Sequence, residues 1–460
     1  MNQDELIYLF VLVISMPIGY FVKNVAKSRE KTYICTGVGV FMTVILCGLH
    51  TFHAFITVLC TILIVKGVGW RYCHVCSFIF NFSYVTFFRA GSYFGLKRPT
   101  GFSNVVMLLL TLKLVGIAYE IHDSNKIRRN RENGVPDPVD RNGKPRYQPI
   151  IDDPSAVDIV HYSFCFIGLF TGPYFKFRTY KDWVHNDNSK DVPLMGPLMA
   201  RLKVLPLIAA LFLGCSYLFN ANMKEEAFYQ HPLWYRLGYM VPAFTIFRMR
   251  MYSAWILSEC VCITAALGAY PSELKSRCGQ GPTVDPAKIQ LNDTKEYDFE
   301  TIHNIDPYKC DFTPTFRDAM RGWNMTVQWW LKNHVFIRFP IKPLSTLVTM
   351  LVSAYWHGIY GSYYLSLLTV PIILIAEDLM MKAFRTEENK VTYDWFNWLF
   401  RMRGFEYLSI AFLVLTGAAL WTYWSSIYFI GHILTFTFIA VGSLYRPKKK
   451  TKNEESTKDK

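Results

Sequence analysis

The sequence predicts an all-α, polytopic integral membrane protein, and two observations support this fold class. Of its 460 residues, 52% are hydrophobic and 18% are charged, whereas soluble domains carry about 25% charged residues. The apolar residues also gather into long runs, and a helix needs about 20 mostly apolar residues to cross a bilayer. A soluble helical protein is therefore disfavoured.

Candidate spans follow one another along the chain and predict about eleven transmembrane helices. The runs at 32–66 and 233–270 are long enough for two passes each. Several runs are short or are interrupted by Gly, Pro or His, which leaves room for re-entrant segments. The runs cover residues 6–22, 32–66, 68–89, 102–119, 157–174, 202–219, 233–270, 345–381, 405–424 and 427–445.

Charges beside the spans predict the orientation. Asp4 and Glu5 precede the first run and four basic residues follow it, so the positive-inside rule makes the N-terminus lumenal. The Lys-rich tail 446–460 is predicted to be cytosolic and disordered, and opposite termini require an odd number of crossings, such as eleven. Cytosolic loops facing an anionic leaflet then explain the net charge of +14 without a nucleic-acid partner.

The spans predict one helical domain over residues 1–445. Within it, residues 271–340 form the longest stretch with few apolar runs and are expected to be a cytosol-facing loop with interfacial helices. The eleven cysteines lie mostly in or beside apolar runs, and no disulfide framework is visible. Cys73 and Cys76 have zinc-like spacing, but no second ligand pair follows, so packing is favoured and no metal or cofactor is expected.

Two polar residues carry the functional hypothesis. His357 lies within the apolar run 345–381, where a full charge costs about 2.5 to 3.5 kcal/mol on insertion scales, so it is expected to face a cavity. Asn324 lies in 321–330 (RGWNMTVQWW), which is amphipathic at helical spacing. A neutral imidazole can take a hydroxyl proton, and a carboxamide can donate to an oxyanion, as acyl transfer requires. Taken alone, His357 also suits packing or a proton relay, and Asn324 an interhelical hydrogen bond.

These residues stand in a recognisable pattern. Residues 321–330, followed by 355–358 (YWHG), resemble the signature of the membrane-bound O-acyltransferases. Longer blocks resemble the lysophosphatidylinositol acyltransferase branch, and the likeness weakens in the loops 125–150 and 272–295. The blocks are ISMPIG at 14–19, FRA at 88–90, TGPYFKFRTY at 171–180, FRMRMYSAW at 247–255 with Glu259 and Cys260, and YDFETIHNID at 297–306.

The resemblance implies an enzyme of the endoplasmic reticulum membrane, built as a helical bundle around a central tunnel. It implies that Asn324 and His357 are the catalytic pair and that acyl-CoA, the co-substrate, enters from the cytosolic side. The branch moves a polyunsaturated acyl chain, typically arachidonoyl, to the sn-2 hydroxyl of lysophosphatidylinositol. The implied partners are acyl-CoA, the lysophospholipid and the bilayer.

Further residues are candidates for substrate binding. They include Arg250 and Glu259. Arg250 can meet a phosphate of CoA or of the lysolipid, since arginine binds phosphate in a bidentate manner. The equal alternative is that the arginine extends to the membrane interface or forms an internal Arg–Glu pair. The neighbours of the proposed pair are expected to line the site. They are Trp323, Gln328, Trp329 and Trp356.

Three alternatives stay open at this point. The first is an acyltransferase with another acceptor, such as a different lysophospholipid, a sterol or a protein hydroxyl. The second is a proton-coupled transporter with His357 in its path, although no two related halves are visible. The third is a catalytically inert scaffold.

Overall fold

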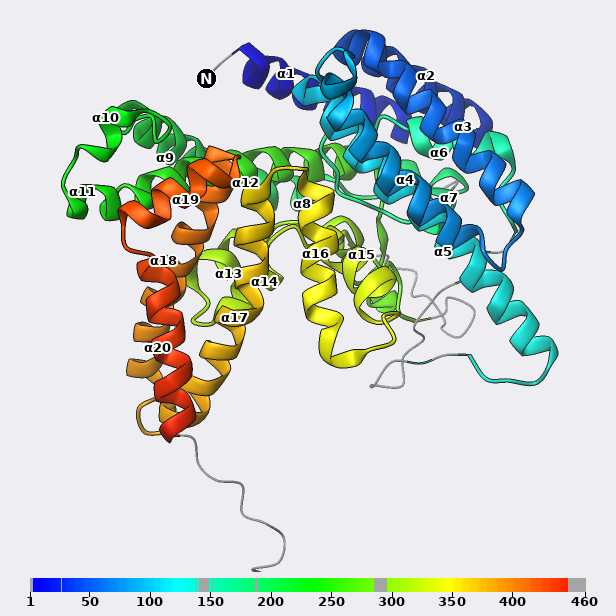
Figure 1. Ribbon diagram of the computed structural model, residues 1–460. Coiled ribbons are helices and arrows are strands. Elements are labelled where there is room, and N and C mark those ends of the chain that lie inside the picture. The colour runs from blue at the N-terminus through cyan, green and yellow to red at the C-terminus, as the bar shows by residue number, and fades with distance from the viewer. Residues whose placement is uncertain are drawn as a thin grey trace, which may run out of the picture. The chain divides into compact units, whose positions relative to one another are not determined.

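A computed structural model describes residues 3–25, 27–137, 139, 149–150, 152–186, 189–284 and 296–445. The described chain is almost entirely helical (Figure 1), which confirms the predicted fold class. Its strands, β1 (Tyr270–Pro271) and β2 (Tyr297–Asp298), pair antiparallel with Tyr270 opposite Asp298. The basic tail predicted at 446–460 lies outside the described residues.

The chain divides into two compact units. The first comprises Met1–Gly214, Arg248–Asp306 and Trp323–Ile359, and the second comprises Cys215–Phe247, Pro307–Gly322 and Tyr360–Lys460. The predicted segment 271–340 is thus shared between both units, and both Asn324 and His357 belong to the first. We describe each unit by itself.

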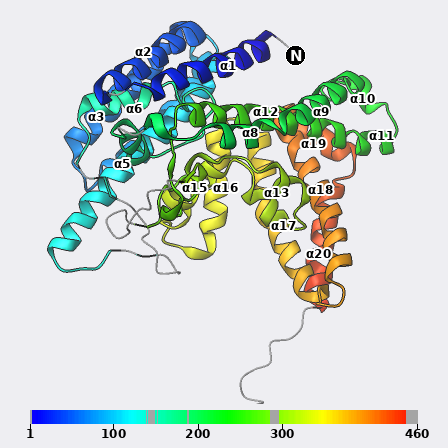
Figure 2. The same ribbon diagram turned by 180° about the vertical axis from the view of Figure 1, so that it is seen from behind.

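The first unit is built around one enclosed helix. It contains α1 (Gln3–Lys23), α2 (Ser28–Cys47), α3 (Thr51–Val68), α4 (Cys73–Ala90), α5 (Gly101–Glu132), α6 (Ala156–Phe164), α7 (Phe177–Val184), α8 (Met195–Leu202), most of α9 (Leu205–Leu218), most of α12 (Met240–Thr264), α15 (Met325–Leu331) and α16 (Ser345–His357). Helix α5 packs against α2, α3, α4, α6 and α7 (Figures 1 and 2). In its apolar window 72% of the residues are buried, against 6% to 28% in the other long apolar helices. Helix α5 is therefore the scaffold of this unit.

The second unit is centred on α17 (Gly361–Phe384), which packs against α18 (Lys390–Val414), α19 (Gly417–Ser426) and α20 (Ile430–Tyr445). Its short helices are α10 (Glu226–Tyr229), α11 (Leu233–Gly238), α13 (Pro307–Phe312) and α14 (Phe316–Arg321). A Cβ atom on Gly442 of α20 would lie 2.9 Å from the backbone and Cβ of Leu379 of α17. The absence of a side chain at Gly442 thus permits the close approach of α17 and α20.

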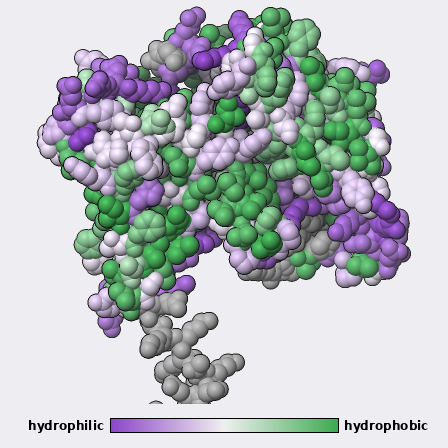
Figure 3. Space-filling model, in the orientation of Figure 1, coloured by the Kyte–Doolittle hydropathy of each residue, from purple (hydrophilic) through white to green (hydrophobic). Residues whose placement is uncertain are grey.

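The polytopic prediction holds, but the described helices differ from eleven uniform spans. By length and composition, five helices can cross a membrane, or six if the bent pair α19 and α20, which meet at 71°, forms one span. The five are Gln3–Lys23, Ser28–Val68, Gly101–Glu132, Met195–Leu218 and Gly361–Phe384. Phe436 and Leu444 of α20 are exposed hydrophobic residues. Figure 3 shows hydrophobic surface over α20 and hydrophilic surface at the C-terminal end of α5.

The run at 157–174 shows why some predicted spans fail. Helix α6 ends at Phe164, and the chain then continues without helical structure, with Gly168 at a positive φ of 74°. The apolar residues of this stretch, including Phe166 and Phe170, are buried in the core of the first unit. Irregular backbone is tolerated at membrane depth where protein surrounds it. The apolar run therefore marks a protein core rather than a lipid-facing helix.

Candidate active site

Asn324 occupies a special backbone position at the start of α15. It has φ 41° and ψ 55°, in the left-handed region that asparagine tolerates better than most residues. Its carbonyl oxygen accepts the Gln328 N–H at 3.1 Å, so it is the N-cap residue of α15. Its side chain makes no capping hydrogen bond, although the side chain of an N-cap residue usually accepts one from the first turn of the helix.

His357 is the last residue of α16. The final carbonyl groups of a helix lack intrahelical partners, and here Arg89 of α4 donates from Nη1 to the Tyr355 carbonyl oxygen at 3.3 Å. Arg89 is itself oriented by a bond from Nε to Asn104 Oδ1 at 2.8 Å. The imidazole is half-buried and lies against the Trp356 ring, with ring centres 5.0 Å apart. An arginine that the sequence marked only as part of a family block therefore fixes the end of the helix that presents His357.

Helix α5 joins the segments that carry these two residues. The indole N–H of Trp330 donates to the Leu112 carbonyl at 3.1 Å, and that of Trp356 donates to the Leu108 carbonyl at 3.2 Å. Four residues of helix rise about 6 Å, so the two tryptophans anchor to successive turns of α5. The π-helical turn η7 (Lys332–Phe336), which continues α15, also packs against α16.

The same residues form one buried hydrophobic cluster. Val327, Trp330 and Leu331, which follow Asn324, share it with Trp356, and Tyr355 packs against it. The other buried members are Phe82, Leu112, Val115, Tyr119, Tyr174 and Val335. The structure thus brings the neighbourhoods of Asn324 and His357 together, as the hypothesis of a catalytic pair requires. The predicted tunnel stays a prediction.

The candidates beside Asn324 all have partners. Trp323 packs against Tyr252 and Trp255, with ring centres 5.8 and 4.9 Å away. Gln328 donates from Nε2 to the Trp323 carbonyl oxygen, so at least one of its amide hydrogens is engaged in local structure. Both residues are held by protein partners beside Asn324, and their role in substrate binding stays a prediction.

Trp329 contacts a cation and a buried histidine. Its ring stacks on Tyr174 at 6.3 Å, and the Lys176 ammonium lies 5.7 Å from the ring centre. His334 meets the same ring edge-on at 5.8 Å. Burial holds the pKa of the His334 imidazole well below its usual value, and the charges of Arg338, Lys176 and His74 act in the same direction. His334 is a neutral member of the site's surroundings that the sequence did not single out.

Arg250 and Glu259 do not pair with each other. Arg250 lies 3.5 Å from Glu5 of α1 and is partly exposed. Glu259 is fully buried and pairs with Arg201, with 2.8 Å between Oε2 and Nε. Its Oε1 accepts the backbone N–H groups of Asn304 and Ile305 at 2.7 and 3.0 Å. The structure therefore gives Glu259 a set of protein partners, and a substrate contact at Glu259 or Arg250 stays a prediction.

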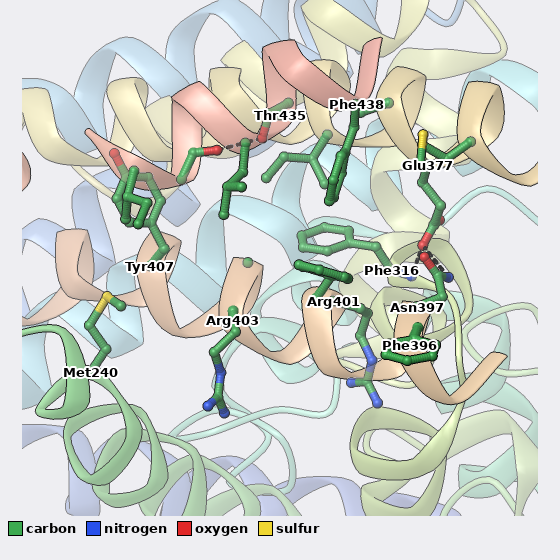
Figure 4. Close-up of a pocket in the computed structure, with 18 of the residues that line it drawn as sticks. Met240, Phe316, Glu377, Phe396, Asn397, Arg401, Arg403, Tyr407, Thr435 and Phe438 are labelled. Atoms are coloured by element: carbon green, nitrogen blue, oxygen red, sulfur yellow. Dashed lines mark hydrogen bonds between the residues drawn. The ribbon is translucent and has the colours of Figure 1, made fainter. Parts of the chain in front are cut away.

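A cavity of about 260 Å³ lies in the second unit, between α17, α18 and α20 (Figure 4). Its walls are mostly apolar, with Glu377 and Asn397 at one end. Neither Asn324 nor His357 lines this cavity. The residues that line this cavity are therefore different from those of the candidate active site.

Comparison with known proteins identifies the family. The model of MBOAT, the membrane-bound O-acyltransferase family, matches residues 88–417. A membrane-bound acylglycerophosphatidylinositol O-acyltransferase of Xenopus laevis is 41% identical over 472 aligned positions, which cover 99% of this chain and 98% of that relative. The protein of the same name in Homo sapiens is 41% identical over 96% of this chain and 94% of its own length.

A more distant relative agrees. The Drosophila melanogaster protein of that name is 33% identical over 96% of this chain and 92% of its own length. These matches favour the enzyme over the transporter and the inert scaffold that the sequence alone left open. The chain belongs to the membrane-bound O-acyltransferase family, and it is a multi-pass membrane protein that acts as an O-acyltransferase.

Proposed function

We propose that this protein moves a polyunsaturated acyl chain, such as arachidonoyl, from acyl-CoA to the sn-2 hydroxyl of lysophosphatidylinositol. The names of relatives that match nearly the whole chain at 41% identity support this acceptor. The observation that carries the chemistry is the shared anchoring of the Asn324 and His357 segments on successive turns of α5. It supports a single site to which both groups contribute.

His357 acts as the general base in the proposed mechanism. A ring nitrogen accepts the proton of the lysolipid hydroxyl as the oxygen attacks the thioester carbonyl carbon. The carbon–sulfur bond of the tetrahedral intermediate then breaks, and the imidazolium returns the proton to the departing CoA thiolate. The new ester bond replaces the thioester bond, so no covalent enzyme intermediate, metal or cofactor is needed.

Asn324 assists by hydrogen bonding. Its carboxamide N–H donates to the developing oxyanion or holds the acceptor hydroxyl, and a donor of this kind contributes about 2.7 to 4 kcal/mol. The left-handed backbone at Asn324 supports this role, because strained backbone positions often occur at active sites. Trp323, Trp329 and Trp356 wall the same region and exclude water from the reacting groups in this proposal.

The proposed location is the endoplasmic reticulum membrane, with the N-terminus lumenal and the C-terminus cytosolic. The acidic residues before the first span and the basic residues after it support this orientation. Acyl-CoA then reaches the site from the cytosolic side, because its charged CoA group keeps it out of the hydrocarbon core.

A direct assay tests the acceptor. Purified protein in lipid nanodiscs is given radiolabelled arachidonoyl-CoA and one lysophospholipid at a time, with inositol, serine, choline or ethanolamine headgroups. We expect lysophosphatidylinositol to show the highest kcat/KM, and a His357→Ala preparation to give the background. A higher kcat/KM with another headgroup would replace the acceptor but keep the chemistry, whereas no transfer to any lysolipid, sterol or peptide hydroxyl would refute the function.

A further inference from the structure

We infer that Asn304 is a positioning residue for Asn324, and that it performs the helix-capping task from which the Asn324 side chain is released. This inference rests on the proposed function, since it assigns Asn304 a role through a catalytic Asn324. Hydrogen bonds and one ion pair among four segments of the first unit carry it: residues 201, 259, 304–305 and 324–326.

Asn304 holds the first turn of α15 by three hydrogen bonds. Its carbonyl oxygen accepts the Met325 N–H at 2.7 Å. Its side-chain Oδ1 accepts the Thr326 N–H at 3.2 Å and the Thr326 hydroxyl at 2.7 Å. Asn304 and Thr326 are both buried, with 1% and 0% of their surfaces exposed. These bonds satisfy the two N–H groups that directly follow Asn324.

Such bonds are normally made by the N-cap residue itself. The first N–H groups of a helix have no intrahelical acceptor, and the side chain of the N-cap residue usually accepts one of them. Asn324 is the N-cap of α15, yet its side chain makes no capping bond. The side chain of Asn304 supplies the missing oxygen, which frees the Asn324 carboxamide to act on substrate while α15 still begins in a defined way.

Glu259 in turn fixes Asn304. Its buried carboxylate accepts the N–H groups of Asn304 and Ile305 on Oε1, and its Oε2 forms an ion pair with Arg201, 2.8 Å from Nε. Hydrogen bonds to an ionised acceptor are about twice as strong as neutral ones. The series Arg201–Glu259–Asn304 is therefore a rigid support, and it ends at the first turn of α15, directly after the left-handed residue.

Thr326 adds a third connection. Its hydroxyl donates to Asn304 Oδ1 and accepts the Tyr174 N–H at 3.1 Å. Both the donor and the acceptor capacity of one hydroxyl are thus used between two loops that are far apart in sequence. Thr326 is the best point at which to loosen the support without touching Asn324.

The test uses matched variants of Thr326 in the full-length protein. Thr326→Val keeps the shape and removes the hydroxyl, whereas Thr326→Ser keeps the hydroxyl. We expect Thr326→Val to lower kcat about 10-fold, because small displacements of a catalytic group are costly, with KM for both substrates within about 2-fold. Thr326→Ser should stay within about 2-fold of wild-type kcat. Asn304→Ala is the second variant and should give a similar loss of kcat.

A buried threonine elsewhere provides the control. Thr57 of α3 is fully buried, and its hydroxyl bonds to the His53 carbonyl of its own helix at 2.7 Å. Thr57→Val should therefore leave kcat unchanged. Melting temperatures in detergent are measured for all variants, so that loss of fold is separated from loss of turnover.

A double variant decides between positioning and general damage. In the Asn324→Ala background, Thr326→Val should cause no further loss of kcat, because residues acting through one group are not additive. Two outcomes would overturn the positioning role alone. In the first, the losses of kcat in the double variant multiply. In the second, Thr326→Val and Asn304→Ala keep wild-type kcat while Asn324→Ala is impaired. Full activity of Asn324→Ala would overturn both this inference and the role of Asn324 in the proposed function.

Discussion

Two buried glutamates, one in each unit, hold backbone in the same manner and differ in the structures that they support. Glu259 receives the N–H groups of Asn304 and Ile305. Glu377 receives those of Phe316 and Arg317, at the start of α14. The first arrangement leads through Asn304 to Thr326, in the first turn of α15 after Asn324, whereas the second borders the apolar cavity of Figure 4.

A buried acid in an apolar helix is thus weak evidence of catalysis. Intramembrane acids are by default functional candidates, but each of these carboxylates is engaged by consecutive backbone N–H groups. The two units also contain different packing environments. In the first unit the backbones of α2 and residues 164–166 touch at Gly39. In the second unit α17 and α20 approach closely at Gly442, and a cavity of about 260 Å³ lies between α17, α18 and α20. Four substitutions test these differences between the units, from the largest expected effect to the smallest.

His357→Ala is expected to have the largest effect on activity. Loss of the general base should lower kcat by about 10²- to 10⁴-fold, with expression and melting temperature near wild type, because the side chain is half-buried and ends a helix. Acyl transfer is measured in nanodiscs. The control is His185→Ala, a substitution of an exposed histidine. A fully active His357→Ala protein would remove this residue from the chemistry.

Asn324→Ala should lower kcat by about 10²-fold, the effect of losing an oxyanion donor. The matched control is Asn397→Ala in the second unit, whose side chain bonds to the Pro314 carbonyl and to Glu377 beside the cavity. Asn397→Ala should keep kcat within about 2-fold and lower only the melting temperature. Equal losses of kcat in both variants would contradict the assignment of catalysis to the first unit.

Gly39→Ala tests the close packing of the first unit. A Cβ atom at Gly39 would lie 1.8 Å from the Phe164 carbonyl oxygen, and the Phe166 N–H bonds to the Cys35 carbonyl one turn earlier in α2. Backbone cannot give way easily, so we expect destabilisation by about 1 to 3 kcal/mol, seen as a lower melting temperature in detergent. Gly37→Ala on the same helix, where a Cβ meets no atom within 4 Å, should be tolerated.

Gly404→Ala probes the cavity wall of the second unit and should have the smallest and opposite effect. A Cβ atom there would lie 3.5 Å from the Phe316 ring, an ordinary contact at the cavity wall. Replacing glycine by alanine inside a helix favours the helix by up to about 1 kcal/mol. The melting temperature should rise slightly at unchanged kcat, and a fall would show that the cavity wall is already fully packed.

The sequence by itself determined the fold class, the membrane character and the two residues at the centre of the proposal. Composition and apolar runs depend on many residues together, so they can be read without tertiary detail. The helices at 3–23 and 101–132 contain the predicted spans 6–22 and 102–119, whereas the predicted run 345–381 is divided into α16 and α17. Asn324 and His357 stood out because polar groups are costly in apolar surroundings.

Tertiary structure alone decided how these residues are supported. The apolar run 157–174 predicts a span, but its apolar residues are buried in the core of the first unit, and an apolar pattern alone cannot distinguish burial in lipid from burial in protein. The partner of Glu259 is Arg201 rather than Arg250, and Asn304 replaces the capping group of Asn324. Such pairings depend on side-chain directions and on contacts between distant segments, which no local pattern of residues encodes.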